Sequence, residues 1–219
     1  MSTYAVKENY LEESVARSYD RQRFENRAGR WFDRLEKRAI RNMVKQVLDE
    51  CPNPTVLDVP CGTGRITETL LDMGLRVTGA DISERMIEVG LERCRRFANR
   101  ASFQILDLDA PDLPQAAFDL VTCIRLMHHL DSRDREGVFR SLARMTRYYV
   151  LVNVSFSSPY YRLRRRVKRR LGQGVSRASS TWRQIQDETR CAGLRLAGHR
   201  FAGRFLSEDL ILLLKKELL

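Results

Sequence analysis

The stretch VLDVPCGTGR, residues 56–65, is the feature that most constrains how this chain folds. A short apolar run ends in an aspartate, and a proline and two glycines, Gly62 and Gly64, follow within six positions. Glycines placed directly after a strand let the backbone turn tightly and approach a ligand, because no Cβ stands in the way. A helix that opens near Arg65 would turn its unpaired N–H groups toward the same ligand. The stretch therefore predicts a ligand-binding loop between a strand and a helix.

From residue 55 onward the chain alternates between strand-like and helical patterns. Short runs rich in β-branched residues predict strands, and helices of roughly 10–15 residues separate them. This alternation is typical of a parallel sheet built from right-handed βαβ units. We expect strands at 55–59, 76–80, 102–106, 120–124, 148–154, 194–201 and 209–215, with helices at 65–73, 84–99, 132–146 and 181–191.

The flanking regions suggest how the chain is organised. Thr181 and Gln184 form a capping-box pattern at the start of the last helix, and the Ala-Gly pair at 192–193 closes that helix. The N-terminal region predicts one or two amphipathic helices that end before Pro52. We therefore expect a helical extension or lid at 1–50 and one binding domain at 51–219, with a basic insertion at about 156–180. The apolar positions at helical spacing in the extension are Trp31, Leu35, Ile40, Val44 and Leu48.

Three aspartates, Asp58, Asp81 and Asp107, close the first three predicted strands. The carboxyl ends of parallel strands meet at the edge where such sheets bind ligands. Asp81 lies where a carboxylate can accept both hydroxyls of a ribose, and Asp107 could accept from an adenine amino group. Each aspartate alone is more simply read as a helix cap or loop residue. Their coincidence on one edge favours a nucleoside ligand.

The loop also separates two kinds of nucleotide-binding enzyme. A dinucleotide-binding loop carries a third glycine, where this chain has Thr67. An acidic residue before the glycines suits a ligand with an ammonium group better than a pyrophosphate. S-adenosylmethionine is therefore favoured as the cofactor over NAD, and a methyltransferase over a dehydrogenase.

Four stretches resemble the motifs of the class I S-adenosylmethionine-dependent methyltransferases. VLDVPCGTG resembles their first motif, with Pro60 where the family usually has glycine, and VTGADIS resembles the second. FQILDLDAPDLP resembles the third, and FDLVTCIRLMHHL the fourth, whose strand and loop face the transferred methyl group. The C-terminal LRLAGHRFAG and DLILLLKK resemble the two strands that close the family's sheet.

The resemblance implies an α/β fold: a Rossmann-like, doubly wound sheet of seven strands, mostly parallel with an antiparallel last strand. It also implies SN2 transfer of a methyl group from sulfonium to a nucleophile, for which alignment of the reactants is the protein's main contribution. The residues expected to bind the cofactor are Asp58, Pro60, Cys61, Gly62, Thr63, Gly64, Asp81, Ile82, Met86, Asp107, Leu108, Ile124 and Arg125.

Candidates for the acceptor side come from three places. His128 and His129 follow the fourth strand, where a histidine can act as a general base near neutral pH. The alternative is that either histidine only holds the loop, and His199, on a late strand, is expected to be structural. Candidates for substrate contacts are Tyr19 and Arg23 in the extension and Tyr160, Arg164 and Arg165 in the insertion.

The insertion is strongly basic. Residues 155–180 contain eight basic residues and no acid, in a chain with a formal net charge of +11. Leu163, Val167 and Leu171 recur every four residues, which predicts a helix with one apolar stripe among arginines. Arginine can grip the phosphate or carboxylate of a small molecule or sugar-lipid. The alternatives are that residues 159–171 lie on an anionic membrane surface, that they follow RNA phosphates, or that the stripe docks a solvated helix.

We therefore expect methyl transfer to a small or lipid- or sugar-linked, anionic acceptor, with transfer to oxygen favoured. RNA ranks second, because CIRLMHHL lacks an Asn/Asp-Pro-Pro-aromatic motif for a base amine. A catalytically silent cofactor-binding partner protein is a further alternative. Five cysteines without a Cys-x-x-Cys pair argue against a zinc site, so no metal is expected. No apolar signal core is found at the N-terminus, which predicts the cytoplasm, or its membrane surface if the insertion binds lipid.

Overall fold

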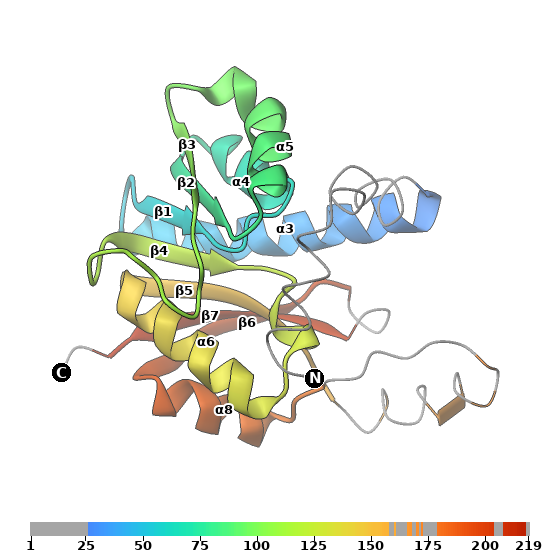
Figure 1. The fold of residues 1–219 in the computed structure, drawn as a ribbon. Coiled ribbons are helices and arrows are strands. Elements are labelled where there is room, and N and C mark those ends of the chain that lie inside the picture. The colour runs from blue at the N-terminus through green and yellow to red at the C-terminus, as the bar shows by residue number, and fades with distance from the viewer. Residues whose placement is uncertain are drawn as a thin grey trace.

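The computed structural model describes residues 26–157, 160, 166–167, 170, 172, 179–203 and 208–217. These residues form one sheet with helices on both of its faces (Figure 1). The described helices are α3 (Arg27–Glu50), α4 (Arg65–Leu71), α5 (Glu84–Cys94), α6 (Ser132–Met145) and α8 (Trp182–Cys191), with 3₁₀ turns η1 (Arg95–Phe97) and η2 (Met127–His129). The strands are β1 (Thr55–Asp58), β2 (Arg76–Asp81), β3 (Ala101–Ile105), β4 (Phe118–Cys123), β5 (Thr146–Ser155), β6 (Leu194–Phe201) and β7 (Asp209–Lys216).

The seven strands are arranged in the order β3-β2-β1-β4-β5-β7-β6. β1 to β5 are parallel to one another, and β7 runs antiparallel to both of its neighbours. The predicted doubly wound sheet with an antiparallel last strand is therefore confirmed. The strand order reverses between β1 and β4, and such a switch point opens a crevice at the carboxyl ends of the strands.

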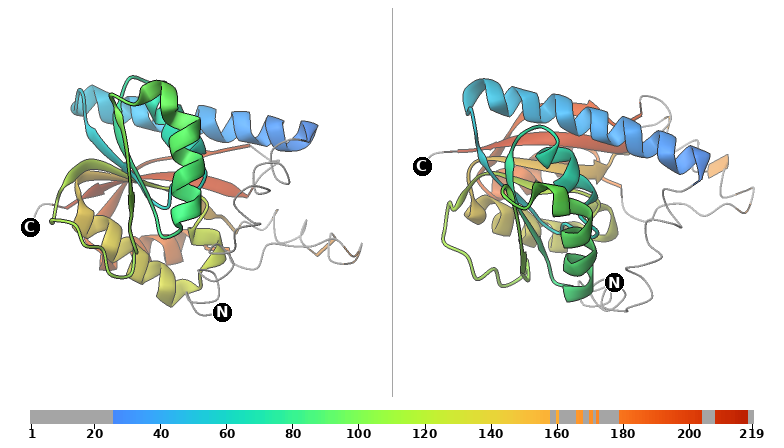
Figure 2. Two further views of the ribbon diagram at one scale, coloured as in Figure 1. Left: turned by 45° about the horizontal axis from the view of Figure 1, so that its top comes forward. Right: turned by 90° about the horizontal axis from the view of Figure 1, so that it is seen from above.

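Alternate residues of the strands pack against opposite layers of helices. Leu57 and Val121 lie in the core between the sheet and α6 and α8, whereas Val56 and Leu120 lie in the core beneath α3 and α4. The views in Figure 2 show these two layers on either side of the sheet. Burying a leucine or valine side chain contributes about 1.5–3 kcal/mol, so the period-two pattern of the strands fixes which side chains face each layer.

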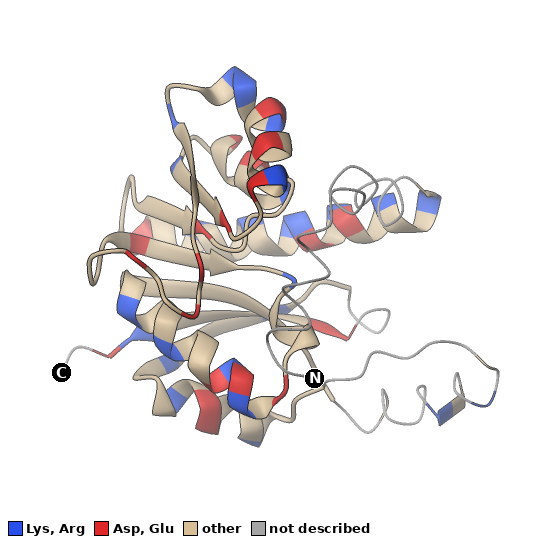
Figure 3. Cartoon of the chain, viewed as in Figure 1, with Lys and Arg blue, Asp and Glu red and all other residues tan. Residues whose placement is uncertain are grey.

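Helix α3 is a single helix of 24 residues, capped at its start by Asn26, whose Oδ1 accepts from the N–H of Gly29 at 2.6 Å. Basic and acidic residues are interspersed along it, as the colouring of Figure 3 shows. The prediction of a buried apolar face is wrong for the first turns of the helix, because Trp31 is 43% exposed and Leu35 is only half-buried. The buried face of the helix instead begins with the carboxylate Glu36 and continues through Ala39, Ile40, Met43, Val44 and Val47.

The local signals at the other helices are largely confirmed. Thr181 and Gln184 form the predicted capping box of α8, in which the N–H of Thr181 donates to Oε1 of Gln184 at 2.9 Å. The helix expected at 84–99 ends earlier, at Cys94, and continues as the 3₁₀ turn η1. His199 lies on β6 and packs edge to face on Trp182, with ring centroids 5.0 Å apart.

Most of the basic insertion lies outside the described residues, as do the substrate candidates Tyr19, Arg23, Arg164 and Arg165. Tyr160 and Val167 have helical backbone, and they are 53% and 51% exposed. Within the described ranges, no helix is both long enough and apolar enough to cross a membrane.

Candidate active site

A cleft opens at the carboxyl ends of β1, β2, β3 and β4, where the sheet reverses its strand order. The empty space within it is about 1090 Å³, a figure that includes open solvent. Both apolar side chains and charged groups of either sign line it. The lining residues are Val59, Pro60, Cys61, Gly62, Thr63, Arg65, Ile66, Asp81, Ile82, Met86, Leu106, Asp107, Leu108, Asp109, Ile124, Arg125, Leu126, Leu130 and Val138.

The two glycines of the loop after β1 have different surroundings. Both have left-handed backbone, with φ of 52° at Gly62 and 75° at Gly64. A Cβ at Gly62 would meet no atom within 4 Å, whereas one at Gly64 would lie 3.0 Å from the Cα of Gly90 in α5. Gly62 therefore borders the cleft, and Gly64 lets α5 pack closely against the start of α4. The loop also contains a cis peptide bond before Pro60.

Asp81 is fixed at the cleft wall by two backbone groups. The N–H of Gly62 donates to its Oδ2 at 2.8 Å, and the N–H of Ser83 donates to its Oδ1 at 3.0 Å. The side chain is 5% exposed, and this burial raises its pKa, while both N–H groups oppose the rise. Asp107 lies one strand further along the sheet and accepts from the N–H of Asp109 at 2.9 Å. Two carboxylates on neighbouring strands thus face the same part of the cleft.

Asp58 lies beneath the loop and is not part of the cleft wall. It is 1% exposed, and it accepts from the hydroxyls of Thr67 at 2.6 Å and Thr122 at 2.7 Å. Burial raises its pKa to about 6, although both hydroxyl groups act in the opposite direction. Thr67 stands at the third-glycine position of dinucleotide-binding loops, and here it anchors the aspartate that ends β1.

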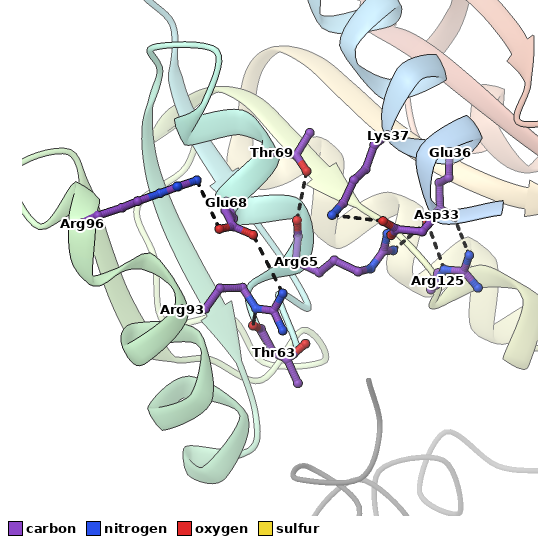
Figure 4. A network of polar contacts seen from close by, with 10 residues as sticks. All are labelled: Asp33, Glu36, Lys37, Thr63, Arg65, Glu68, Thr69, Arg93, Arg96 and Arg125. Atoms are coloured by element: carbon purple, nitrogen blue, oxygen red, sulfur yellow. Dashed lines mark hydrogen bonds and ion pairs between the residues drawn. The ribbon is translucent and has the colours of Figure 1, made fainter. Parts of the chain in front are cut away.

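Two arginines in the cleft wall share one buried carboxylate from α3 (Figure 4). Glu36 accepts from Nη2 of Arg65 at 2.6 Å and from Nε of Arg125 at 3.2 Å, both at Oε2. Its Oε1 lies 3.1 Å from Nη2 of Arg125. Asp33, one turn earlier in α3, pairs with Nη1 of Arg65 and with Lys37. Burial is the largest single influence on the pKa of Arg65 and lowers it, but the two carboxylates together outweigh burial, so the pKa is raised.

The backbone of Arg125 is also held in an uncommon conformation. Its φ is 68°, a left-handed value that costs a residue with a side chain about 1 kcal/mol or more. Its N–H donates to Oδ1 of Asn153 at 2.6 Å, and Asn153 is 1% exposed on β5. Contacts from β5 and α3 together fix the position of this residue at the end of β4.

The cleft brings together most of the residues that the sequence nominated. Asp58 and Gly64 lie outside its wall, for the reasons given above. His128 and His129 lie on η2, with ring centroids 4.2 Å apart, between the lining residues Leu126 and Leu130, but neither is in the wall. A role for either histidine as a base stays a prediction. The nominated residues in the wall are Pro60, Cys61, Gly62, Thr63, Asp81, Ile82, Met86, Asp107, Leu108, Ile124 and Arg125.

Sequence reasoning missed eight lining residues. Most are apolar residues at strand ends or on helices, where the pattern is the same as that of the core. Arg65 carried a usable signal, because it directly follows the glycine loop at the first position of α4. The missed residues are Val59, Arg65, Ile66, Leu106, Asp109, Leu126, Leu130 and Val138.

Comparisons with known proteins identify the kind of domain and the fold. Residues 56–148 match the family model described as "Methyltransferase domain". The demethylmenaquinone methyltransferase of Tropheryma whipplei (strain Twist) is 31% identical over 150 residues, covering 63% of this chain and 62% of that protein. The ubiquinone biosynthesis O-methyltransferase of Coxiella burnetii (strain Dugway 5J108-111) is 34% identical over 80 residues, covering 36% and 34%. The chain thus spans less than two thirds of either relative.

Solved structures share the fold over the full chain. The magnesium protoporphyrin IX methyltransferase of Synechocystis PCC 6803 with bound SAH has a TM-score of 0.80 at 18% identity, covering 99% of this chain and 100% of that one. At this identity, the likeness concerns the fold. A structure of the same protein with bound SAM has a TM-score of 0.73.

The sheet has the fold of solved S-adenosylmethionine-dependent methyltransferases, and the family model that matches residues 56–148 is that of a methyltransferase domain. The Synechocystis enzyme that shares this fold is solved with bound S-adenosylmethionine (SAM) and with bound SAH. The cleft suits this cofactor, because Gly62 leaves open space beside Asp81. In the part of the chain that the structure describes, no three His, Cys, Asp or Glu side chains are grouped to hold a metal ion.

Proposed function

We propose that this protein transfers the methyl group of S-adenosylmethionine to an oxygen atom of a small or lipid- or sugar-linked, anionic acceptor. The observation that carries the proposal is the cleft at the strand switch point, with one carboxylate at the end of β2, another after β3, and arginines after β1 and β4. The rest of the wall includes the apolar side chains of Ile124, Leu126, Leu130 and Val138. An apolar wall excludes water, which would otherwise compete with the acceptor.

When bound, S-adenosylmethionine supplies an electrophilic methyl group, so that a bond from the acceptor to carbon forms as the carbon–sulfur bond breaks. In this proposal Asp81 accepts from the ribose hydroxyls, and the N–H groups of Gly62 and Ser83 hold its carboxylate in one orientation. Asp107 would accept from the adenine. Holding donor and acceptor in line can lower the barrier by several kcal/mol, at most about 7–11 kcal/mol.

The side chains that line the cleft favour an acceptor that is already ionised, because they include few groups that could act as a general base. Among the lining residues of the described chain there is no His, Lys or Tyr, and burial raises the pKa of the Cys61 thiol well above its ordinary value. A carboxylate or an acidic phenolate needs no base before it attacks, whereas an alcohol or amine must lose a proton. The quinone and porphyrin methyltransferases that this chain is similar to are consistent with a small acceptor. The basic segment at 155–180 suits one with negative charge.

Labelled S-adenosylmethionine and a fractionated lysate test the proposal. We expect label in the small-molecule or lipid fraction and not in RNA. Brief treatment with alkali then separates two kinds of oxygen acceptor, because methyl esters release methanol and methyl ethers do not. Label in RNA would identify an RNA methyltransferase. Cofactor binding without label in any fraction would identify a silent partner protein.

A further inference from the structure

Glu36 is a buried carboxylate that reaches the cleft region from outside the matched domain. It is 1% exposed on α3, 29 residues before Arg65 and 89 before Arg125, yet it contacts the guanidinium groups of both. A carboxylate at this depth is stable only when it is well paired. The two arginines satisfy that need, but they also lie in the cleft wall. The cluster therefore joins α3 to the binding surface.

The lining charges change sign along the sheet. Asp107 follows β3 and Asp81 ends β2, whereas Arg65 begins the helix after β1 and Arg125 follows β4. Since the order of these strands is β3-β2-β1-β4, the two acidic residues stand on one side of the cleft and the two arginines on the other. S-adenosylmethionine has the same polarity: hydroxyl and amine donors at its adenosine end, and a carboxylate in its amino-acid end.

The two guanidinium groups need a fixed carboxylate between them. Like charges that share one site repel each other, and both arginines have long side chains with several rotamers. Glu36 bridges them from Oε2, and Oε1 adds a second contact with Arg125. Asn153 fixes the backbone of Arg125 from the opposite side. The guanidinium groups are thereby oriented before any ligand binds, which lowers the cost of binding.

We propose that Glu36 is a positioning residue, which holds Arg65 and Arg125 so that they meet the carboxylate at the amino-acid end of S-adenosylmethionine. The inference rests on the proposed function, because it takes the cleft to be the cofactor site. It assigns to α3, outside residues 56–148, a part in cofactor affinity that is exerted through the two arginines.

Two nucleosides separate positioning from general support of the fold. S-adenosylhomocysteine keeps the amino-acid end, and 5′-methylthioadenosine lacks it. Titration calorimetry of the Glu36→Gln variant should show S-adenosylhomocysteine bound about tenfold more weakly, since charge-assisted contacts to its carboxylate are lost. Affinity for 5′-methylthioadenosine should stay within about twofold of the wild type. Equal losses for both nucleosides, or no loss for either, would overturn the inference.

Glu188→Gln is the matched control. Glu188 is 3% exposed on α8 and binds Arg135 at 2.6 and 3.0 Å, so its loss also removes a buried carboxylate from an arginine. We expect Glu188→Gln to lower the thermal midpoint without changing the ratio of the affinities for S-adenosylhomocysteine and 5′-methylthioadenosine. A change in that ratio as large as that of Glu36→Gln would also overturn the inference.

A second variant covers the case in which Glu36→Gln does not fold. Glu36→Asp keeps the charge on a side chain that is one methylene shorter. The ratio of the affinity for S-adenosylhomocysteine to the affinity for 5′-methylthioadenosine should therefore be lower than in the wild type. An unchanged ratio would count against positioning. In the wild type itself, equal affinity for the two nucleosides would refute this inference but not the proposed function. Failure to bind either nucleoside would refute the cofactor site, and the proposed function with it.

Discussion

The charge of Asp58 is coupled to folding. Burial raises its pKa from 3.8 to about 6, so the folded chain binds this proton more tightly than the unfolded chain does. Between these two pH values the folded state holds more protons, and the free energy of unfolding therefore falls as pH rises. The stabilising contribution is fully present below about pH 4, and it is lost as pH rises through about 6. Its upper bound is about 3 kcal/mol.

The Asp58→Asn variant should lack this contribution. We expect the stability of the wild type, measured relative to the variant by urea unfolding, to fall by about 1–3 kcal/mol between pH 4 and pH 7. Other titrating groups, Asp81 among them, are present in both proteins and largely cancel in the difference. The amide can still accept from Thr67 or Thr122, so the variant should fold. Parallel stability curves over this pH range would show that Asp58 keeps an ordinary pKa.

Asp81 tests the assignment of the cofactor site. Replacing it with alanine removes a charged acceptor for two ribose hydroxyls and also frees the N–H groups of Gly62 and Ser83. The affinity for S-adenosylhomocysteine should fall by about 1–3 kcal/mol, as measured by calorimetry. Asp119→Ala is a suitable control, because Asp119 binds Thr55 at the amino end of β1, away from the cleft. An affinity equal to that of the wild type would mean that the ribose does not contact Asp81.

Among the secondary-structure elements, α8 offers a test of local stability. Thr181 and Gln184 each accept from the other's backbone N–H at its start. Thr181→Ala removes one of these bonds and should cost about 1 kcal/mol, which corresponds to a fall of roughly 2–4 °C in the thermal midpoint. Thr181→Ser keeps the hydroxyl and should lose less. A midpoint unchanged in the alanine variant would show that the cap contributes nothing to global stability.

The strands were more predictable than the helix that completes the site. Short runs rich in β-branched and other apolar residues located every strand to within about two residues, because the central strands are buried on both faces and read as nearly continuous apolar runs. α3 was harder, since Trp31 and Leu35 suggested a face that the helix does not bury. The usable sign was Glu36, four residues before Ile40 and so on the same side as the true apolar face. Its partners could not be predicted, because Arg65 and Arg125 approach it only through the tertiary fold.

At the scale of the whole molecule, the cleft depends on segments that are far apart in the chain. Asp81 and Asp107 follow β2 and β3, in the half of the sheet on one side of the switch point. Arg125 follows β4 in the other half, and Asn153 on β5 accepts from its backbone N–H. α3 packs on α4, β6 and β7, so it links the glycine loop to the C-terminal strands. Ligand binding at the switch point should therefore stabilise the entire sheet, and not only residues 56–148.

Thermal unfolding with ligand present measures that linkage. At a concentration about 100 times its dissociation constant, S-adenosylhomocysteine should add about 2.7 kcal/mol to the free energy of unfolding. For a chain of this length the thermal midpoint should rise by about 5–10 °C, in a single transition. NAD at the same concentration should leave the midpoint unchanged, because Thr67 occupies the third-glycine position and holds Asp58 beneath the loop. A rise with NAD and none with S-adenosylhomocysteine would assign the cleft to a dinucleotide. Two separate transitions, with only one moved by ligand, would instead show that α3 and the C-terminal strands unfold independently of the cofactor site.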